Sequence, residues 1–495
     1  HAGTGTLQVT STSNANVTIT NSQFNQNNAT IHGGALFNES YAYARGYKYL
    51  YGNIYSTTTA NSTASVIATG TTITENTATN GGGIYNRNYA YGYADSLNNY
   101  YYGSDNNIES SSNVTSEATI TIADSTITKN QATNGQGGGI YNYNEAKSLA
   151  NSRNTGTYHY YSGSSLATST TTGKATITIN NSTLLENTAT GEGGAIYNKN
   201  LANSDATSHR SNYGNATATS NSTANTTITV TDSTIAKNTA GTSGGGIYTS
   251  NTATSKASYT VGSNGSGSSK TTSNANVIIT VSNSTIANNK ALNGIAGGIY
   301  NYNDATGTSG SSGTTNADTC ITLVNATLAG NTATSTTGGI YTSTNSTHNI
   351  YGNNSANVKS KNYVYLLNSI AYANYSGTVG HDIYFAGLVD DAGNTIGGDN
   401  EYRMRRFYVA YSIFGTSNLD PHRNYMIESF ELTTTATNVG RIFGIENVDF
   451  GTIPSGVPQL SDDNLTVKIS AQGEAALRGT LIGQDADNNY YYWNM

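Results

Sequence analysis

The chain has few of the residues that mark disulfide-bonded, membrane-spanning or nucleic-acid-binding proteins. Its single cysteine, Cys320, excludes an intramolecular disulfide framework. No apolar run is long enough to cross a bilayer, so we expect no membrane span in this chain. Only 10% of the residues are charged, and the net charge of -7 has the wrong sign for neutralising phosphates. We therefore expect no nucleic-acid partner.

Proline is almost absent. The three prolines, Pro421, Pro454 and Pro458, all follow residue 420, so every earlier residue keeps its backbone N–H. A long hydrogen-bonded ladder of strands needs such a chain, because proline cannot donate to it. Glycine and tyrosine are abundant instead, with 54 and 38 residues. The composition favours an extended, repetitive β-structure.

A pattern of 25 residues recurs along the chain and is clearest at residues 118–142, ATITIADSTITKNQATNGQGGGIYN. Such a period is the main evidence for a repeat architecture. Each copy has an apolar residue, an asparagine three positions later, a glycine-rich step and an apolar-aromatic pair. We expect this asparagine and the glycines to form corners of the chain, because both residue types tolerate left-handed backbone angles. The asparagines are Asn27, Asn76, Asn130, Asn187, Asn238, Asn289 and Asn331, and the aromatic residues are Phe37, Tyr85, Tyr141, Tyr197, Tyr248, Tyr300 and Tyr341.

The segment that enters each copy alternates strictly between apolar and small polar residues, as in Ile120 and Ile122. A period of two indicates a strand with one buried face. One copy cannot bury this face alone, but stacked copies can, because each strand then pairs with its equivalents above and below. We predict an all-β fold, a right-handed single-stranded parallel β-helix, or solenoid. The seven asparagines would form a structural ladder and the seven aromatic residues an aromatic ladder.

Long inserts separate the copies, whose aromatic positions are 41 to 56 residues apart. Asparagine and alanine alternate in the outgoing limbs, as in Asn88 and Ala90, and the returning limbs are Ser/Thr/Ala runs. We predict that these arms stack into a lateral wing with tyrosine-rich tips, such as residues 100–102 and 158–161. Flexible low-complexity loops are the alternative.

Composition also predicts how the chain is divided. Residues 1–355 form the repeat β-helix with its insert arms, and residues 356–495, where charges and prolines appear, form an irregular continuation with a C-terminal cap. Near the N-terminus, strand-like residues begin at Thr6 without a comparable cap. An open strand edge can pair with another chain. We therefore expect self-association into head-to-tail polymers.

Two copies carry the motif of a known family most fully. Phe24 and Asn27 precede Gly33-Gly34-Ala35-Leu36, and Leu184 and Asn187 precede Gly193-Gly194-Ala195-Ile196. These FxxN and GGA(I/L/V) motifs are similar to the repeat of polymorphic outer-membrane proteins and related autotransporter-type bacterial surface proteins. The resemblance covers residues 1 to about 385. It implies a β-helical passenger that acts in adhesion or surface display, and hence a secreted, extracellular or cell-surface location.

The function that we predict is a non-enzymatic structural one: an adhesin-like rod or the subunit of an extracellular filament. Its partners would be further copies of itself and a surface glycan or protein receptor, with no cofactor and no metal. One alternative is a carbohydrate-active β-helix enzyme, whose acids and bases would come from the C-terminal charged cluster of His381, Asp382, Asp390, Asp391, Arg403, Arg405 and Arg406.

A lesser alternative is ice binding, because threonines alternate with the core isoleucines. Thr119 and Thr121 begin a flat grid of hydroxyl groups that would also include Thr176, Thr178, Thr229 and Thr231. Ile278 and Ala68 would interrupt this grid, and the wing would cover it.

Overall fold

The computed structural model of the chain describes most of residues 3–386 and several strands beyond them. Every element in the described part is a β-strand. No described helix is long and apolar enough to cross a membrane. The described residues are 3–50, 52–98, 106–155, 163–211, 214–262, 265–351, 356–377, 379–380 and 382–386, together with the strands β33 to β39.

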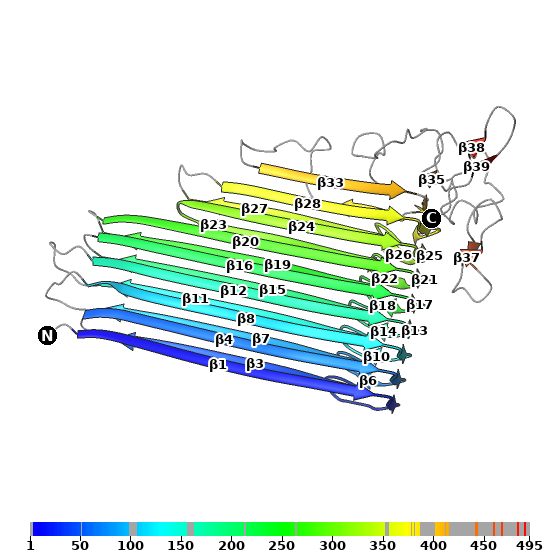
Figure 1. The fold of residues 1–495 in the computed structure, drawn as a ribbon, viewed down its shortest axis with the longest axis horizontal. Coiled ribbons are helices and arrows are strands. Elements are labelled where there is room, and N and C mark those ends of the chain that lie inside the picture. The colour runs from blue at the N-terminus through cyan, green and yellow to red at the C-terminus, as the bar shows by residue number, and fades with distance from the viewer. Residues whose placement is uncertain are drawn as a thin grey trace.

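Two long parallel sheets run together through the molecule and stack rung upon rung (Figure 1). Each repeat forms one closed coil, and the two long sheets extend from the stack of coils. In each repeat the chain leaves the coil along one sheet, which we call the outbound sheet, and comes back along the other, which we call the return sheet. The outbound sheet contains β3 (Leu36–Tyr49), β7 (Ile84–Asn98), β11 (Ile140–Asn154), β15 (Ile196–Arg210), β19 (Ile247–Val261), β23 (Ile299–Ser309), β27 (Ile340–Ile350) and β32 (Ile383–Ala386). The return sheet contains β1 (Gly3–Thr20), β4 (Gly52–Thr69), β8 (Ile108–Ala123), β12 (Gly163–Asn180), β16 (Gly214–Thr231), β20 (Gly265–Ser282), β24 (Ser312–Val324), β28 (Ala356–Leu367) and β33 (Glu401–Ala410).

Two columns of short strands close each coil at one end of these long sheets (Figure 1). The first column contains β2 (Gln23–Asn25), β5 (Thr72–Thr74), β9 (Thr126–Thr128), β13 (Thr183–Leu185), β17 (Thr234–Ala236), β21 (Thr285–Ala287), β25 (Thr327–Ala329), β29 (Ile370–Tyr372), β34 (Ser412–Phe414) and β35 (Arg441–Phe443). The second contains β6 (Thr77–Ala78), β10 (Gln131–Ala132), β14 (Thr188–Ala189), β18 (Thr239–Ala240), β22 (Lys290–Ile295), β26 (Thr332–Ser335), β30 (Tyr375–Ser376) and β31 (Val379–Gly380). The predicted parallel β-helix is confirmed.

The coil has an aliphatic interior. In the fourth coil, Ile177 and Ile179 of the return sheet, Leu184 of β13 and Ile196 of the outbound sheet are all fully buried. The equivalent residues of neighbouring coils lie directly above and below them, because the strands pair in register. This stacking buries the apolar face that one repeat could not cover alone.

The arms are strands, so the predicted wing is confirmed and the alternative of flexible loops is wrong for the described residues. Inside the wing, alternate residues of the two sheets face each other and are mainly alanine, serine and asparagine. Ser148 of the outbound sheet donates to the carbonyl of Ser112 in the return sheet at 2.8 Å. A serine side chain that reaches the opposite backbone shows that the two sheets lie very close together.

The corners differ from the prediction at one position. We expected the repeat asparagine to adopt the left-handed backbone angles of the second corner. The residue with positive φ is instead the one before it, and Glu186, for example, has φ of 55°. The glycine corner is as expected, with Gly193 at φ of 69°. The asparagine is therefore free to use its side chain for contacts between coils.

The two ends of the stack differ in their pairing. At one end, β1, β2 and β3 pair on a single side within the described chain. At the other end, β31 and β35 pair antiparallel to β30 and β34, which places a reversed strand on the edge of both short columns. The long sheets continue past residue 355 through β28 and β33. The predicted division of the chain at that residue stays a prediction.

Candidate functional site

The repeat asparagines form one continuous file through the coil. Asn187 donates its amide to Oδ1 of Asn238 at 3.0 Å and to the carbonyl of Ile127 at 2.8 Å. Its own Oδ1 accepts from both the backbone N–H and the amide of Asn130 at 3.0 Å. The same contacts recur from coil to coil, and they join Asn27, Asn76, Asn130, Asn187, Asn238, Asn289, Asn331 and Asn374.

This coil ladder ends at a carboxylate. Asn374 donates its backbone N–H and its amide to Oδ1 of Asp382, at 3.1 and 2.7 Å. Each ladder amide donates one of its hydrogens to the next Oδ1 toward the C-terminal end, so the last position needs a side-chain oxygen that accepts, which Asp382 supplies. Asp382 is also buried, with 2% of its surface exposed. It is thus a ladder residue in this fold, whereas sequence reasoning had placed it in a catalytic cluster.

The aromatic residues of the repeats stack in a second file on the outer side of the outbound sheet. Neighbouring rings from Phe37 to Tyr384 are nearly parallel, with centroids 4.5 to 5.8 Å apart. Burial raises the pKa of Tyr300 to about 12 and also raises that of Tyr141 and Tyr197. These phenols therefore stay neutral at physiological pH. The file joins Phe37, Tyr85, Tyr141, Tyr197, Tyr248, Tyr300, Tyr341 and Tyr384.

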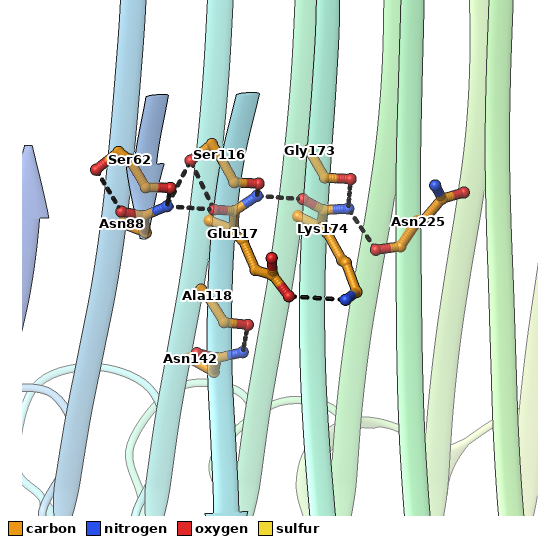
Figure 2. A network of polar contacts seen from close by, with 11 residues as sticks. Ser62, Asn88, Ser116, Glu117, Ala118, Asn142, Gly173, Lys174 and Asn225 are labelled. Atoms are coloured by element: carbon orange, nitrogen blue, oxygen red, sulfur yellow. Dashed lines mark hydrogen bonds and ion pairs between the residues drawn. The ribbon is translucent and has the colours of Figure 1, made fainter. Parts of the chain in front are cut away.

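Two further amide ladders in the wing were missed by sequence reasoning. In the wing ladder, each amide donates to the next Oδ1 along Asn88, Asn144, Asn200, Asn251 and Asn303, and serines of the return sheet bond to it (Figure 2). A parallel file joins Asn38, Asn86, Asn142 and Asn198. The alternation of asparagine and alanine in the arms was the available signal, because alternate residues share one face of a strand.

The parallel file is interrupted at Thr249, which occupies the position of an asparagine. Its side chain is too short to continue the bonds. As a result, Nδ2 of Asn198, Oγ1 of Thr249 and Oδ1 of Asn301 are all buried without a hydrogen-bond partner in the described chain. The ladder resumes when Asn301 donates to Thr342 at 3.1 Å. This break is the clearest local defect of the wing.

The outer side of the outbound sheet changes character along the stack. In the first three coils it carries a cluster that we call the tyrosine face. Its rings stack from strand to strand, with Tyr41 4.9 Å from Tyr89 and Tyr43 5.1 Å from Tyr91. The exposed fractions on β3 are 56, 45, 50 and 42% for Tyr41, Tyr43, Tyr47 and Tyr49. The face consists of Tyr41, Tyr43, Tyr47, Tyr49, Tyr89, Tyr91, Tyr93 and Tyr143.

Cations lie over these rings. The guanidinium carbon of Arg45 is 5.5 Å from the centroid of Tyr93, and Nζ of Lys147 is 5.9 Å from that of Tyr91. Such contacts favour a positive charge at the ring face. Burial, with a smaller contribution from Glu145, raises the pKa of Tyr89 to about 12, so its hydroxyl remains a donor.

The carboxylates of this region have partners within the protein. Glu39 pairs with Arg87 at 3.2 Å. Asp95 pairs with Arg153 at 2.8 Å and also accepts from the hydroxyl of Tyr93 at 2.7 Å. Tyr143 likewise donates its hydroxyl to Glu145 at 2.7 Å. The exposed groups of this face therefore include the rings of Tyr41, Tyr43 and Tyr47 and the cations of Arg45 and Lys147.

The enzyme alternative stays a prediction, because Asp382 is the one residue of its cluster whose side chain the structure describes. Its candidate residues His381, Asp390 and Asp391 lie outside the described residues, and Arg403, Arg405 and Arg406 are described only as backbone of β33. The tyrosine-rich tips at residues 100–102 and 158–161 also lie outside them. Within the described residues, no group of three or more His, Cys, Asp or Glu side chains could hold a metal ion.

The fold and its ladders define a repeat protein of the parallel β-helix class. A family model for the Chlamydia polymorphic membrane protein repeat matches residues 70–87, 181–199 and 232–250. Each match begins at the turn that follows a return strand and includes a ladder asparagine and the glycine-rich step. No curated protein and no solved structure matches the chain.

The chain therefore carries polymorphic membrane protein repeats at three sites, consistent with a polymorphic outer-membrane protein. That family is surface-exposed and located at the outer membrane. The predicted resemblance and the cell-surface location are confirmed at this level.

Proposed function

We propose that this chain is a non-enzymatic, adhesin-like rod that binds a surface receptor through the tyrosine face. The observation that carries the proposal is the change along the outer side of the outbound sheet. Its first three coils present eight tyrosines, whereas the equivalent positions of β19 and β27 are mainly serine, threonine and asparagine. The backbone is the same in both regions, so the difference is not required by the fold.

The chemistry of the tyrosine face suits recognition. Tyrosine and arginine are enriched in the centres of protein interfaces, because they combine large contact area with polar groups. The rings here are held by stacking against their neighbours, so little side-chain entropy is lost on binding. Aromatic and phenolic groups also suit a glycan receptor. A flat two-sheet scaffold presents them in fixed positions.

Binding of fluorescent beads that carry the full chain would test this function, with cultured cells and a glycan array as targets. We expect the double variant Tyr43→Ser and Tyr91→Ser to lose most of the binding while its melting temperature stays close to that of the wild type. Tyr302→Ser is the matched control, because Tyr302 lies on the same sheet outside the tyrosine face. Equal binding by all three proteins would exclude this face as the receptor site.

Head-to-tail association is a second part of the proposal. The outer edges of β1, β2 and β3 pair with no other strand in the described chain, and an open edge can accept a strand of another copy. A contact of this kind repeats without closing and gives filaments. Negative-stain electron microscopy over a range of concentrations tests it. Filaments that lengthen with concentration are expected, and isolated rods at the highest concentration would rule association out.

A further inference from the structure

The outer side of the return sheet carries a second regular surface, opposite the tyrosine face. Its centre consists of fifteen residues from the first five strands, three from each strand, which we call the threonine face. Ten of them are threonine and none is charged. They are Gln8, Thr10, Thr12, Thr57, Thr59, Asn61, Ser111, Asn113, Thr115, Thr168, Thr170, Thr172, Thr219, Asn221 and Thr223.

The positions of these side chains repeat in two directions. The five strands pair in register without a shift over the whole face. The side chains are therefore about 4.8 Å apart across the strands and about 6.6 Å apart along them. Threonine is branched at Cβ and has few rotamers, so its hydroxyl and methyl groups are held in nearly fixed places. The face is a preorganised grid of hydroxyls and methyls.

The grid is rigid because it is supported from beneath. The residues that alternate with it face the outbound sheet and are buried, with Thr58, Ala60, Ser112, Ser169 and Ser220 all at 0% exposure. By contrast, none of the fifteen side chains of the face hydrogen-bonds to another group in the part of the chain that the structure describes. Their donors and acceptors point to solvent.

The grid predicted from sequence, at Thr119, Thr121, Thr176, Thr178, Thr229 and Thr231, lies on the same side of the return sheet, nearer the coil than the threonine face. The wing does not cover that grid, contrary to the expectation from sequence, because the wing is the continuation of the same sheet (Figure 1). The residue that interrupts the grid in β4 is also different. Ala68 is buried in the coil, and the exposed residue is Ile67. Ile278 is exposed as expected. At the spacings given above, the fifteen positions of the threonine face cover roughly 500 Å².

Charge and composition restrict the partner. A nucleic acid or another polyanion would need cations, and the face has none. A protein interface would be expected to contain aromatic residues, methionine or arginine at its centre, and these are also missing. Charged residues stand only at its margin, where Lys270 lies beside Thr219, Glu109 precedes Ser111, and Lys174 and Glu117 pair with each other at 2.7 Å. An uncharged, flat lattice of hydroxyl donors and acceptors matches these features.

We propose that the threonine face binds ice. The neutral hydroxyls would hydrogen-bond to water molecules of the crystal surface, and the methyl groups would fill the gaps between them. Because the side chains are already ordered, binding loses little conformational entropy. Growth of the crystal is then restricted to the surface between adsorbed molecules. This inference does not rest on the adhesin proposal, which uses the opposite face.

The test uses the purified full chain and measures thermal hysteresis, together with adsorption of the fluorescently labelled protein to a growing single ice crystal. We expect the wild type to lower the freezing temperature below the melting temperature and to bind defined planes of the ice crystal. Thr59→Lys and Thr170→Lys place a long charged side chain in the middle column of the face and should abolish both effects. Thr254→Lys, on the outer side of the outbound sheet, is the matched control and should keep both.

Circular dichroism spectra and melting temperatures must agree among the four proteins, so that a lost effect is not caused by unfolding. If Thr170→Lys unfolds the chain, Thr59→Lys alone decides the outcome. A wild type without hysteresis and without adsorption overturns the proposal. So does a loss of activity in Thr254→Lys with none in Thr59→Lys. Binding to crystalline cellulose with no effect on ice would also overturn it and would assign the face to a polysaccharide lattice.

Discussion

The coil and the wing are built from the same strands but have different interiors. Where a strand passes through the coil, its inward residues are aliphatic, as with Ile228 and Val230 of β16. In the part of the same strand that lies in the wing, the inward residues are Ser220, Ser222 and Ala224. The coil surrounds a space that large side chains must fill, whereas the two sheets of the wing approach closely enough for serines to reach the opposite backbone.

The comparison shows that a parallel ladder of strands can be held together in two ways. In the coil, apolar burial is the main favourable term. In the wing, each buried amide or hydroxyl must find a partner, because an unpaired buried group costs about 1–3 kcal/mol. A polar interior is stable only if its network is complete. The following variants test this difference, from the largest expected effect to the smallest.

Asn187→Ala should be the most damaging change, since it removes a link of the coil ladder. It leaves the backbone N–H of Asn130 and one of the two N–H groups of its amide without an acceptor, while the other amide N–H still donates to Ile73. Two orphaned donors at about 1–3 kcal/mol each predict a loss of about 2–6 kcal/mol in the free energy of unfolding. Urea unfolding of the full chain measures this loss. Asn221→Ala, on the outer surface, is the control and should change it by less than about 0.5 kcal/mol.

Ala224→Leu tests how close the two sheets of the wing are. Ala224 is fully buried in a cluster of alanines with Ala202 and Ala253. A leucine there would separate the sheets and should cost about 1–3 kcal/mol or more. Ile235→Leu keeps the volume of a coil residue and should cost less than about 1.5 kcal/mol. Equal melting temperatures for the two variants would show that the wing is more loosely packed than the structure indicates.

Thr249→Asn should stabilise the protein by completing the interrupted amide file of the wing. The new side chain would accept from Asn198 and donate to Asn301, which now have unpaired buried atoms. The neighbouring coils already hold asparagine at this position, so the column has room for it. We expect a gain of about 1–3 kcal/mol from thermal unfolding. Thr249→Ser, which adds no amide, should give no gain, and a melting temperature that falls in Thr249→Asn would contradict the assignment.

Asp205→Asn should reduce the dependence of stability on pH. Burial raises the pKa of Asp205 above its usual value, against the opposing effect of Lys256. A raised folded-state pKa means that the folded chain holds the proton more tightly. The contribution of this group to the free energy of unfolding is fully present below the pKa of the unfolded chain, about 3.9, and is lost as the pH rises through the pKa of the folded chain. Melting temperatures between pH 3 and 7 measure it, and an unchanged slope in the variant would disprove it.

Much of the fold could be predicted because the same sequence pattern occurs seven times. Alternation identified the inward isoleucines, and the constant offset of the asparagines placed them at one level of every coil. Local ambiguity caused the errors. In Val66-Ile67-Ala68 three apolar residues follow one another, so alternation cannot say which face each takes. In the structure, Ile67 pairs with Thr18 and Thr121, which lie on the outer side of the sheet, so Ile67 is the residue that faces outward.

The candidate faces were less predictable than the core. Tyrosine at alternate positions of one strand, as in Tyr41, Tyr43, Tyr47 and Tyr49, indicates a shared side, but not whether that side meets solvent or another sheet. The same is true of the threonines in the return strands. A strand has two sides, and only the packing of the two long sheets shows which one remains open.

The sequence by itself determined the rung: the strand alternation, the corners rich in asparagine and glycine, and the recurring asparagine and tyrosine, because these depend on short-range geometry that every copy repeats. The tertiary structure alone decided that the arms close on each other as a thin polar wing, that Asp382 terminates the coil ladder, and which side chains face outward. Those features depend on contacts between residues from 8 to about 60 positions apart, and no local pattern specifies them.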